Sequence, residues 1–330
     1  MAYVVATMNQ THSCSAAVLK RFGRNEAIFR WFAFGAACLV LLVFAGIIAA
    51  LCNGAWLALS TFGFGFLTST AWNPVTGKFG ALPAIYGTLM TSALAMIIAV
   101  PVGIGTAIFL TDLCPRPLRR PVGIAIELLA GIPSIIYGIW GLFVFAPFFQ
   151  QSVEPRIINA FGDVPLLTNL FAGPPYGIGI FTASLILSIM VLPFISAVAR
   201  DVFETVPPML KEAAYGLGCT RWEVTWNVVL PFARTGVVGG SMLALGRALG
   251  ETMAVTFVIG NAHAIPSSLF APGTTISATI ANEFTEAVGD LYVSSLIAIG
   301  LILFVITFLV LAAAQLMLRR LEARAGGRNQ

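Results

Sequence analysis

The stretch WFAFGAACLVLLVFAGIIAALC, residues 31–52, is an unbroken apolar run that contains no charged side chain. A helix needs about 20 such residues to cross the roughly 30 Å hydrocarbon core of a bilayer. Five further, predominantly apolar runs follow at about residues 85–110, 121–149, 178–198, 237–260 and 291–318. The sequence therefore predicts six transmembrane helices.

The composition supports this class of protein. Of the 330 residues, 58% are hydrophobic and only 10% are charged, whereas an ordinary soluble domain carries about 25% charged residues. A soluble chain with this composition could not cover its surface with polar groups. The apolar runs are also continuous, whereas transmembrane β-strands are stretches of about ten residues with alternating polarity. We therefore predict an all-α integral membrane protein.

The basic residues predict how the helices are oriented, because cytoplasmic loops of membrane proteins are enriched in Lys and Arg. Only Lys78 and Arg156 fall on one side of the predicted membrane, and Arg247 lies within a span. The other fifteen fall on the opposite side, at residues 20–30, 116–120, 200–234 and 319–328. Both termini are therefore expected in the cytoplasm, with tails at 1–30 and 319–330 around a transmembrane domain at 31–318. The net charge of +4 follows from this topology and does not indicate nucleic-acid binding.

Several kinds of chemistry are not indicated by the sequence. The five cysteines have no CxxC spacing, and the two histidines, His12 and His263, lie far apart, so no metal site is predicted. No Gly-rich loop ends in Lys-Ser or Lys-Thr, the pattern of a nucleotide-binding P-loop. We therefore expect this chain to bind neither a metal nor ATP by that route.

One loop on the predicted external side has helical character. The sequence TTISATIANEFTEAVGD, residues 274–290, is apolar enough for a short helix that lies at the membrane interface or dips into it. Its acidic end contains Glu283, Glu286 and Asp290. These carboxylates fit either a contact with a soluble external partner or a solvated acidic loop, and the pattern leaves both interpretations open.

The long internal loop, residues 201–234, carries the most specific spacing in the chain. It contains EAAYGLGCTRWEVTWNVVLP, residues 212–231. The pattern predicts a short helix, a break at Gly216 and Gly218, and a second helix that ends near Pro231.

This spacing resembles the cytoplasmic signature loop of permease subunits of binding-protein-dependent ABC importers. The matching positions follow the pattern EAA-x3-G-x9-[I/V]-x-L-P, with Val228 where isoleucine is common. In that family the loop forms a coupling helix that docks on the ATPase subunit. The resemblance implies that ATPase coupling involves Glu212, Ala213, Ala214, Gly218, Leu230 and Pro231.

Three further stretches narrow the resemblance to the permeases of phosphate-specific ABC importers. They are FGALPAIYGTLMTS (79–92), ELLAGIPSIIYGIWG (127–141) and LGRALGETMAV (245–255). The resemblance implies the type I importer permease fold and a location in the bacterial inner membrane. It also implies four kinds of partner, namely a second homologous permease, an ATPase dimer that holds ATP and Mg²⁺, a periplasmic phosphate-binding protein, and inorganic phosphate itself.

Two charged residues inside the fifth predicted span are candidates for contact with phosphate. Arg247 and Glu251 are four residues apart, so a continuous helix would place them on one face about 6 Å apart. An ionised side chain costs roughly 2.5–3.5 kcal/mol at the bilayer centre and is by default a functional candidate. Arginine presents a planar fork of donors that suits phosphate, and a neighbouring carboxylate keeps the contact weak and transient. Glu127, expected nearer the cytoplasmic surface, is a third candidate.

Other interpretations remain open at this stage. Arg247 and Glu251 could instead form an ion pair that only holds the bundle together. A permease for another oxyanion, such as sulfate or molybdate, would keep the coupling loop but would not need this pair. A stand-alone ion-coupled transporter or anion channel would explain the buried charges, but the coupling loop argues against it.

Overall fold

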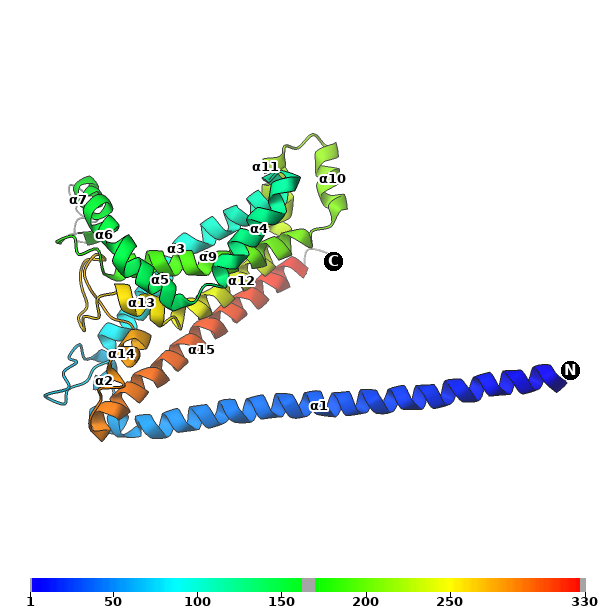
Figure 1. Cartoon of the computed structure of the whole chain (residues 1–330), viewed down its shortest axis with the longest axis horizontal. Helices are drawn as coiled ribbons and strands as arrows, with labels where there is room; N and C mark the ends of the chain where they lie inside the picture. Colours follow the sequence, from blue (N-terminus) through cyan, green and yellow to red (C-terminus); the bar gives the residue numbers. More distant parts are fainter. Residues whose placement is uncertain (1, 162–169, 172, 327–330) are drawn as a thin grey trace. The chain divides into compact units, whose positions relative to one another are not determined.

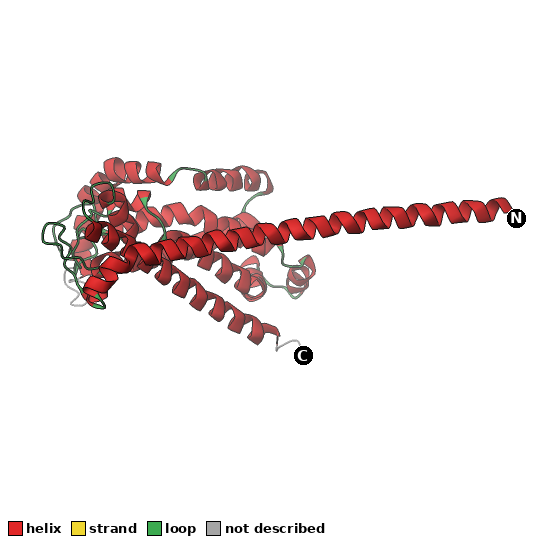
Figure 2. Ribbon diagram, turned by 90° about the horizontal axis from the view of Figure 1, so that it is seen from below, coloured by secondary structure: helices red, strands yellow, loops and turns green. Residues whose placement is uncertain are grey.

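The computed structural model describes residues 2–161, 170–171 and 173–326 of the chain. Within these ranges the regular elements are helices, and no β-strand occurs (Figure 2). The all-α prediction is therefore confirmed. By its internal contacts the chain divides into two compact units, Met1–Gly54 and Ala55–Gln330.

The first unit is formed by most of one helix, α1 (Ala2–Phe62). The last turns of α1 belong to the second unit. Its segment Ile28–Phe62 is long and apolar enough to cross a membrane. The span predicted at residues 31–52 is therefore confirmed and is longer at both ends. Residues 2–30, predicted to be a tail, continue the same helix.

The second unit supplies the other five helical segments that are long and apolar enough to span a membrane, so six occur among the described residues, as predicted. Figure 1 shows their arrangement within this unit. They are α3 (Leu82–Ile108) with the π-helical turn η1 (Phe109–Leu113); α5 (Ser134–Trp140) continued by η2 (Gly141–Phe145), α6 (Ala146–Phe148), η3 (Phe149–Val153) and α7 (Glu154–Phe161); α9 (Ile180–Glu204); α11 (Arg221–Val224) continued by η4 (Thr225–Val229) and α12 (Leu230–Leu249); and α15 (Asp290–Gly326).

The shorter helices lie between these spans. A short helix was predicted within residues 274–290, and α14 (Ile276–Glu283) confirms it. Its side chains Ile276, Ser277, Ala278 and Thr279 are buried. The short helices are α2 (Gly65–Thr68), α4 (Arg116–Ala130), α10 (Pro208–Gly216), α13 (Met253–Val258) and α14 (Ile276–Glu283).

The helix α9 is the centre of the bundle, and 67% of its most apolar window is buried. Its most extensive contact is with α3, and it also packs against α12, α4 and α13. Small residues allow this close approach, since membrane helices gain stability from backbone proximity and not from a difference in hydrophobicity between helix and lipid. At Gly103 of α3, an added Cβ would lie only 2.7 Å from Cγ2 of Ile195 on α9.

The substitution Gly103→Val is therefore expected to destabilise the bundle by about 1–3 kcal/mol, the usual cost of overpacking a tight contact. The control is Gly105→Val on the same helix, because no atom lies within 4 Å of the position of its added Cβ. Thermal unfolding of the detergent-solubilised variants measures the difference. Equal melting temperatures for the two variants would contradict the close α3–α9 contact.

Three π-helical turns precede prolines and explain how the helices continue through them. Pro147, Pro155 and Pro231 each stand two residues after the end of a π turn, namely η2, η3 and η4. A proline has no N–H and its ring clashes with the carbonyl four residues earlier, and local π-helical adjustment relieves both problems. The predicted helix end near Pro231 is therefore wrong, since α12 begins at Leu230 and runs on through Pro231 to Leu249.

Two predicted spans are interrupted. The run at 121–149 is divided between α4 and α5 at residues 131–133, because Ile132 precedes Pro133 and such a residue disfavours helical backbone. The run at 237–260 is divided between α12 and α13 at residues 250–252, so its prediction as one continuous helix is wrong. Gly250 has a low helix propensity, and α13 begins afresh after Glu251 and Thr252.

Candidate translocation path and coupling surface

Arg247 lies in the last turn of α12, and its side chain is exposed on this single chain. A cation at this position interacts favourably with the carbonyl groups at the helix C-terminus. Among the residues described, Arg247 makes neither an ion pair nor a side-chain hydrogen bond. Its guanidinium group is therefore available to a ligand or to a partner chain.

Glu251 does not share a helix face with Arg247, and that prediction is wrong. The helix stops at Leu249, and Glu251 follows in the break, half-buried. One carboxylate oxygen of Glu251 accepts a long hydrogen bond from the backbone N–H of Ala254 at 3.4 Å, which helps to start α13. The structure therefore gives no ion pair between Arg247 and Glu251 within the described residues, and the purely structural interpretation of the pair loses its basis.

The two interrupted spans meet each other. The helices α5 and α13, each of which follows a break, pack together. At Gly138 of α5 an added Cβ would lie 3.0 Å from the carbonyl oxygen of Met253, at the start of α13. Broken helices at membrane depth leave backbone groups that must be satisfied by protein or by a polar cavity, and transporters place substrate sites at such breaks.

Glu127 lies away from this arrangement. It sits on α4, 48% exposed, and its Oε1 accepts an ion-pair contact from Nη2 of Arg200 on α9 at 2.7 Å. Glu127 is thus paired with Arg200. Glu127 contacts neither Arg247 nor Glu251. Its part in a phosphate path stays a prediction.

The coupling loop has the predicted break. The helix α10 ends at Gly216, and Gly218 adopts φ +87°, a left-handed conformation that glycine accepts without steric cost. Thr220 then forms a capping box with Glu223, in which each side chain accepts a hydrogen bond from the other residue's backbone N–H, and α11 begins. The loop is therefore an ordered helix–turn–helix element.

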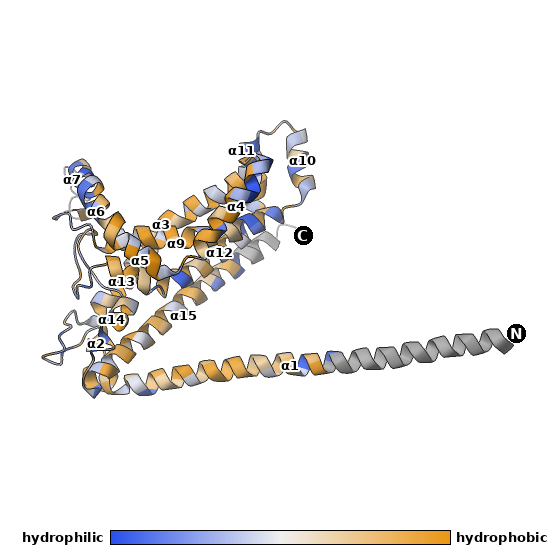
Figure 3. Cartoon of the chain, viewed as in Figure 1, coloured by the Kyte–Doolittle hydropathy of each residue, from blue (hydrophilic) through white to orange (hydrophobic). Residues whose placement is uncertain are grey.

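The outer surface of this loop carries several exposed apolar side chains among polar ones. Glu212 and Ala213 are exposed, whereas Ala214 packs partly against the core. Leu217 is 86% exposed, and the exposed rings of Trp222 and Trp226 stack with their centroids 5.5 Å apart. Exposed apolar groups at an otherwise hydrophilic end of a molecule mark a protein contact surface, and Figure 3 shows hydrophilic residues gathered around α10, α11 and the start of α4.

Asp112 fastens the loop to the bundle. It lies in η1 at the end of α3, with its side chain only 13% exposed. Its carboxylate accepts from Nζ of Lys211 at 3.3 Å and from the hydroxyl of Thr225 at 3.2 Å. Asp112 was not among the predicted site residues, although it is the sole acidic residue between Glu26 and Glu127 in the sequence, and that isolation was a usable signal.

Leu230 and Pro231 take a different position from the other predicted coupling residues. Both lie in the first turn of α12, with Leu230 packed partly against the core around Phe203 and Val229. Glu212, Ala213 and Gly218 lie outward on the loop instead. The coupling motif thus has exposed residues on the loop and a residue, Leu230, that packs against the core.

Glu283 is half-buried and hydrogen-bonded within the chain, which favours neither of the two interpretations left open for it, an external contact or a solvated loop. Its side chain is 19% exposed. It accepts hydrogen bonds from Trp72 Nε1 at 2.7 Å and from the Tyr292 hydroxyl at 2.6 Å, and it lies 2.6 Å from His263 Nε2. Burial raises the pKa of this carboxyl, but the hydrogen bonds from His263, Tyr292 and Trp72 outweigh burial, and the pKa lies below its usual value. Glu286 and Asp290 are exposed.

This cluster predicts a pH-dependent stability. Since the folded pKa of Glu283 lies below that of an unfolded glutamate, about 4.3, its ionised form stabilises the fold above that pH. The contribution is lost as the pH falls through the folded pKa. The Glu283→Gln variant is expected to be less stable at neutral pH by about 1.5–3 kcal/mol, the usual range for a hydrogen-bonded charge. It should also lose less stability on acidification than the wild type.

Thermal unfolding between neutral pH and about pH 3.5 tests this expectation in the acid range of a glutamate. The control is Glu286→Gln, which removes one charge from an exposed side chain nearby. A Glu283→Gln profile parallel to the wild type would show that this carboxylate does not set the acid sensitivity.

Comparisons with known proteins identify the family of this chain. Residues 99–323 match the family model described as "Binding-protein-dependent transport system inner membrane component". The "Phosphate transport system permease protein PstC" of Mesorhizobium japonicum is 66% identical over 326 residues, which cover 99% of this chain and 100% of that protein. The protein of the same name in Pasteurella multocida is 58% identical over 301 residues, which cover 91% and 94% of the two chains.

The solved structures support the fold alone. A chain of a bacterial ABC transporter involved in the import of the acidic polysaccharide alginate superimposes with a TM-score of 0.60 at 19% identity, over 88% of this chain and 96% of that one. Neither the fold nor the curated relatives favour a permease for sulfate or molybdate. The chain therefore belongs to the binding-protein-dependent transport system inner membrane components, and within them to the PstC family of phosphate transport permeases.

Proposed function

We propose that this multi-pass membrane protein forms part of the path by which inorganic phosphate enters a bacterial cell through the inner membrane. The observation that carries the proposal is the interrupted fifth span, where Arg247 closes α12 and Glu251 occupies the break. An unpaired arginine beside broken helix backbone offers donors to an anion at membrane depth.

In this proposal Arg247 and Glu251 have opposite roles. The guanidinium fork of Arg247 donates two hydrogen bonds to phosphate oxygens and keeps its charge in any surroundings. Glu251 repels the same anion, so the contact is weak enough for phosphate to move on. Selectivity and tight binding then reside in a separate periplasmic phosphate-binding protein.

The chain is a transport subunit, and the chemistry that drives it belongs to partners. We infer a second homologous permease of the PstA type, which completes the path, and an ATPase dimer, which binds ATP and Mg²⁺. The exposed apolar side chains Leu217, Trp222 and Trp226 support docking of the ATPase, and the hydrogen bond that Lys211 donates to Asp112 supports transmission of movement to α3. This arrangement requires the coupling loop and both termini to lie in the cytoplasm.

Uptake of labelled phosphate tests the substrate. Cells that lack their own phosphate importers would receive this chain with its partner subunits, and excess unlabelled sulfate or molybdate would be added as competitor. We expect uptake that depends on the ATPase subunit and is unchanged by either competitor. Uptake of sulfate without uptake of phosphate would contradict the proposed substrate. Phosphate uptake that persists without the ATPase would contradict the proposed coupling to ATP hydrolysis.

A further inference from the structure

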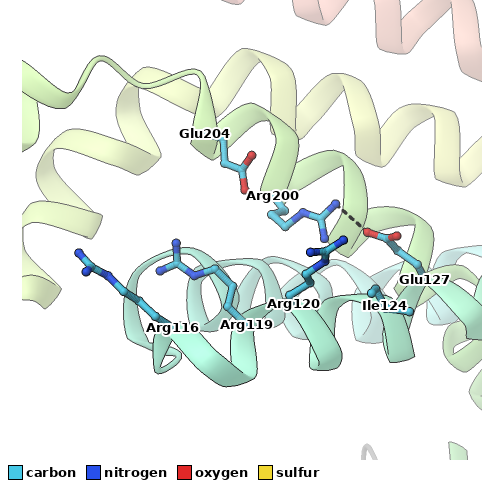
Figure 4. A pocket seen from close by; sticks show the side chains of 7 residues that line it. All are labelled: Arg116, Arg119, Arg120, Ile124, Glu127, Arg200 and Glu204. Carbon is cyan, nitrogen blue, oxygen red and sulfur yellow. Dashed lines mark ion pairs between the residues drawn. The ribbon is translucent and has the colours of Figure 1, made fainter.

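A cavity of about 460 Å³ lies between α4 and α9 (Figure 4). It is separate from the proposed path, since its lining comes from these two helices and not from α12. The end of α9 leads directly into α10, so the cavity is at the same end of the bundle as the coupling loop. Its charged lining consists of four arginines, Arg116, Arg119, Arg120 and Arg200, against two glutamates, Glu127 and Glu204.

Two of the four arginines, Arg116 and Arg120, use none of their side-chain donors within the described residues. Arg200 is paired with Glu127 at 2.7 Å and lies 3.5 Å from Asp201, and Arg119 donates to the backbone carbonyl of Thr111. In the part of the chain that the structure describes, Arg116 and Arg120 make no ion pair or side-chain hydrogen bond. Their five N–H donors each are therefore free for an anion.

Beside the cavity, α4 packs closely against the side chain of Arg200. At Gly123 of α4 an added Cβ would lie 3.2 Å from Nη1 of Arg200, so a larger residue would press on this guanidinium. Figure 4 shows the guanidinium group of Arg200 paired with Glu127, with the side chains of Arg116, Arg119 and Arg120 extending from the same side of α4. The excess of arginine leaves the cavity positively charged despite the Arg200–Glu127 pair.

The opposite face of α4 is apolar. Leu118 and Leu128 are 53% and 68% exposed, and Ile124, which is also exposed, stands at the edge of the cavity. At 3.6 residues per turn, Leu118 lies opposite the arginines, whereas Ile124 and then Leu128 follow Arg120 at intervals of four residues along the flank of the arginine face. A helix with one basic and one apolar face is suited to the boundary between headgroups and acyl chains of a bilayer.

We propose that this cavity binds the phosphate group of an anionic ligand at the membrane surface, as a second anion site distinct from the translocation path. Two sources share this chemistry, the headgroup of an anionic phospholipid and free inorganic phosphate. Arg116 and Arg120 donate to the phosphate oxygens in the bidentate manner that guanidinium groups favour. A lipid would in addition lay its acyl chains along Ile124 and Leu128.

The test uses the whole importer, this chain with its partner subunits, purified in a neutral detergent. Phosphatidylglycerol is titrated against the complex and its adducts are counted by native mass spectrometry, with zwitterionic phosphatidylcholine in parallel. Binding of labelled inorganic phosphate is measured by equilibrium dialysis in the absence of the periplasmic protein. All arms carry Arg247→Gln, so that phosphate in the path is not counted.

The double variant Arg116→Gln/Arg120→Gln is expected to bind phosphatidylglycerol about thirtyfold more weakly, given the usual attraction of an arginine near an anionic lipid surface. The matched control, Arg319→Gln/Arg320→Gln, removes two exposed charges from α15 and should bind like the parent. If inorganic phosphate binding is lost in the Arg116/Arg120 variant while lipid binding is not, the source is the free anion.

Equal binding of both ligands to the Arg116/Arg120 variant and the control would overturn the proposal, as would absence of binding to the parent. Crosslinking of Arg120→Cys to the ATPase subunit would then reassign the arginines to a protein contact. The variant Arg116→Lys/Arg120→Lys keeps the charges and should retain most of the binding, which separates loss of the site from misfolding. Failure of this test would leave labelled-phosphate uptake, and with it the proposed function, unaffected.

Discussion

Replacing Arg247 by glutamine is expected to remove most phosphate uptake while leaving the membrane level of the protein unchanged. The side chain has no ion-pair partner among the described residues, so its removal leaves no carboxylate of this chain unpaired. A charge-assisted contact with an anion is worth about 2–3 kcal/mol, which corresponds to a roughly 30- to 140-fold loss of uptake. This loss is measured as labelled-phosphate uptake in cells without their own phosphate importers.

The matched control is Arg234→Gln, because Arg234 is an exposed arginine on the same helix α12 but near its other end. It should transport like the parent. The variant Arg247→Lys keeps the charge without the planar fork, and an intermediate rate is expected. Normal uptake by Arg247→Gln would leave the family assignment intact and would remove Arg247 from the path.

Replacing Asp112 by asparagine is expected to uncouple ATP hydrolysis from transport. The substitution removes the charge that holds Lys211, at the foot of α10, and weakens the bond to Thr225. Loss of a partly buried, charged hydrogen bond costs about 1.5–3 kcal/mol. We therefore expect roughly tenfold or more loss of uptake, whereas ATP hydrolysis by the assembled complex continues.

The control is Asp201→Asn, which removes one carboxylate that is 71% exposed. A swapped variant, Asp112→Lys/Lys211→Asp, restores opposite charges and should recover part of the coupling, as expected for two residues that interact directly. Copurification of the subunits must stay normal. A proportional fall of uptake and ATP hydrolysis in Asp112→Asn would show that Asp112 supports assembly or turnover and does not transmit movement.

The number and kind of helices follow from the sequence because hydrophobic length is a direct requirement of the bilayer. All six predicted spans have a counterpart among the described helices. Their interruptions were harder to predict. Neither Pro133 nor Gly250 changes the hydropathy of its run enough to be noticed, yet each acts on backbone geometry, through a missing N–H and a weak helix propensity. The opposite error occurred at Pro231. This proline was predicted to end a helix, but it follows a π turn and the helix continues through it.

The site could be predicted only in part, for a related reason. The spacing of Arg247 and Glu251 had meaning only if the helix between them was continuous, and it is not. The break in the coupling loop was predictable because Gly218 acts locally, through its own φ. Asp112 and Glu283 bind partners that are distant in the sequence. Lys211 is 99 residues from Asp112, and Trp72 is 211 residues from Glu283, so local sequence patterns could not predict these contacts.

The π turn at η4 fixes the angular phase of the coupling loop. One residue of an α-helix corresponds to about 100° of rotation, and a π turn holds one residue more than an α-turn. Deleting Asn227 would therefore restore α-helical register and turn α11 and α10 by about 100° around the axis of α12. The stacked Trp222 and Trp226 would then point in another direction. A one-residue insertion or deletion at this point acts as a rotation of the docking face and not as a change in loop length.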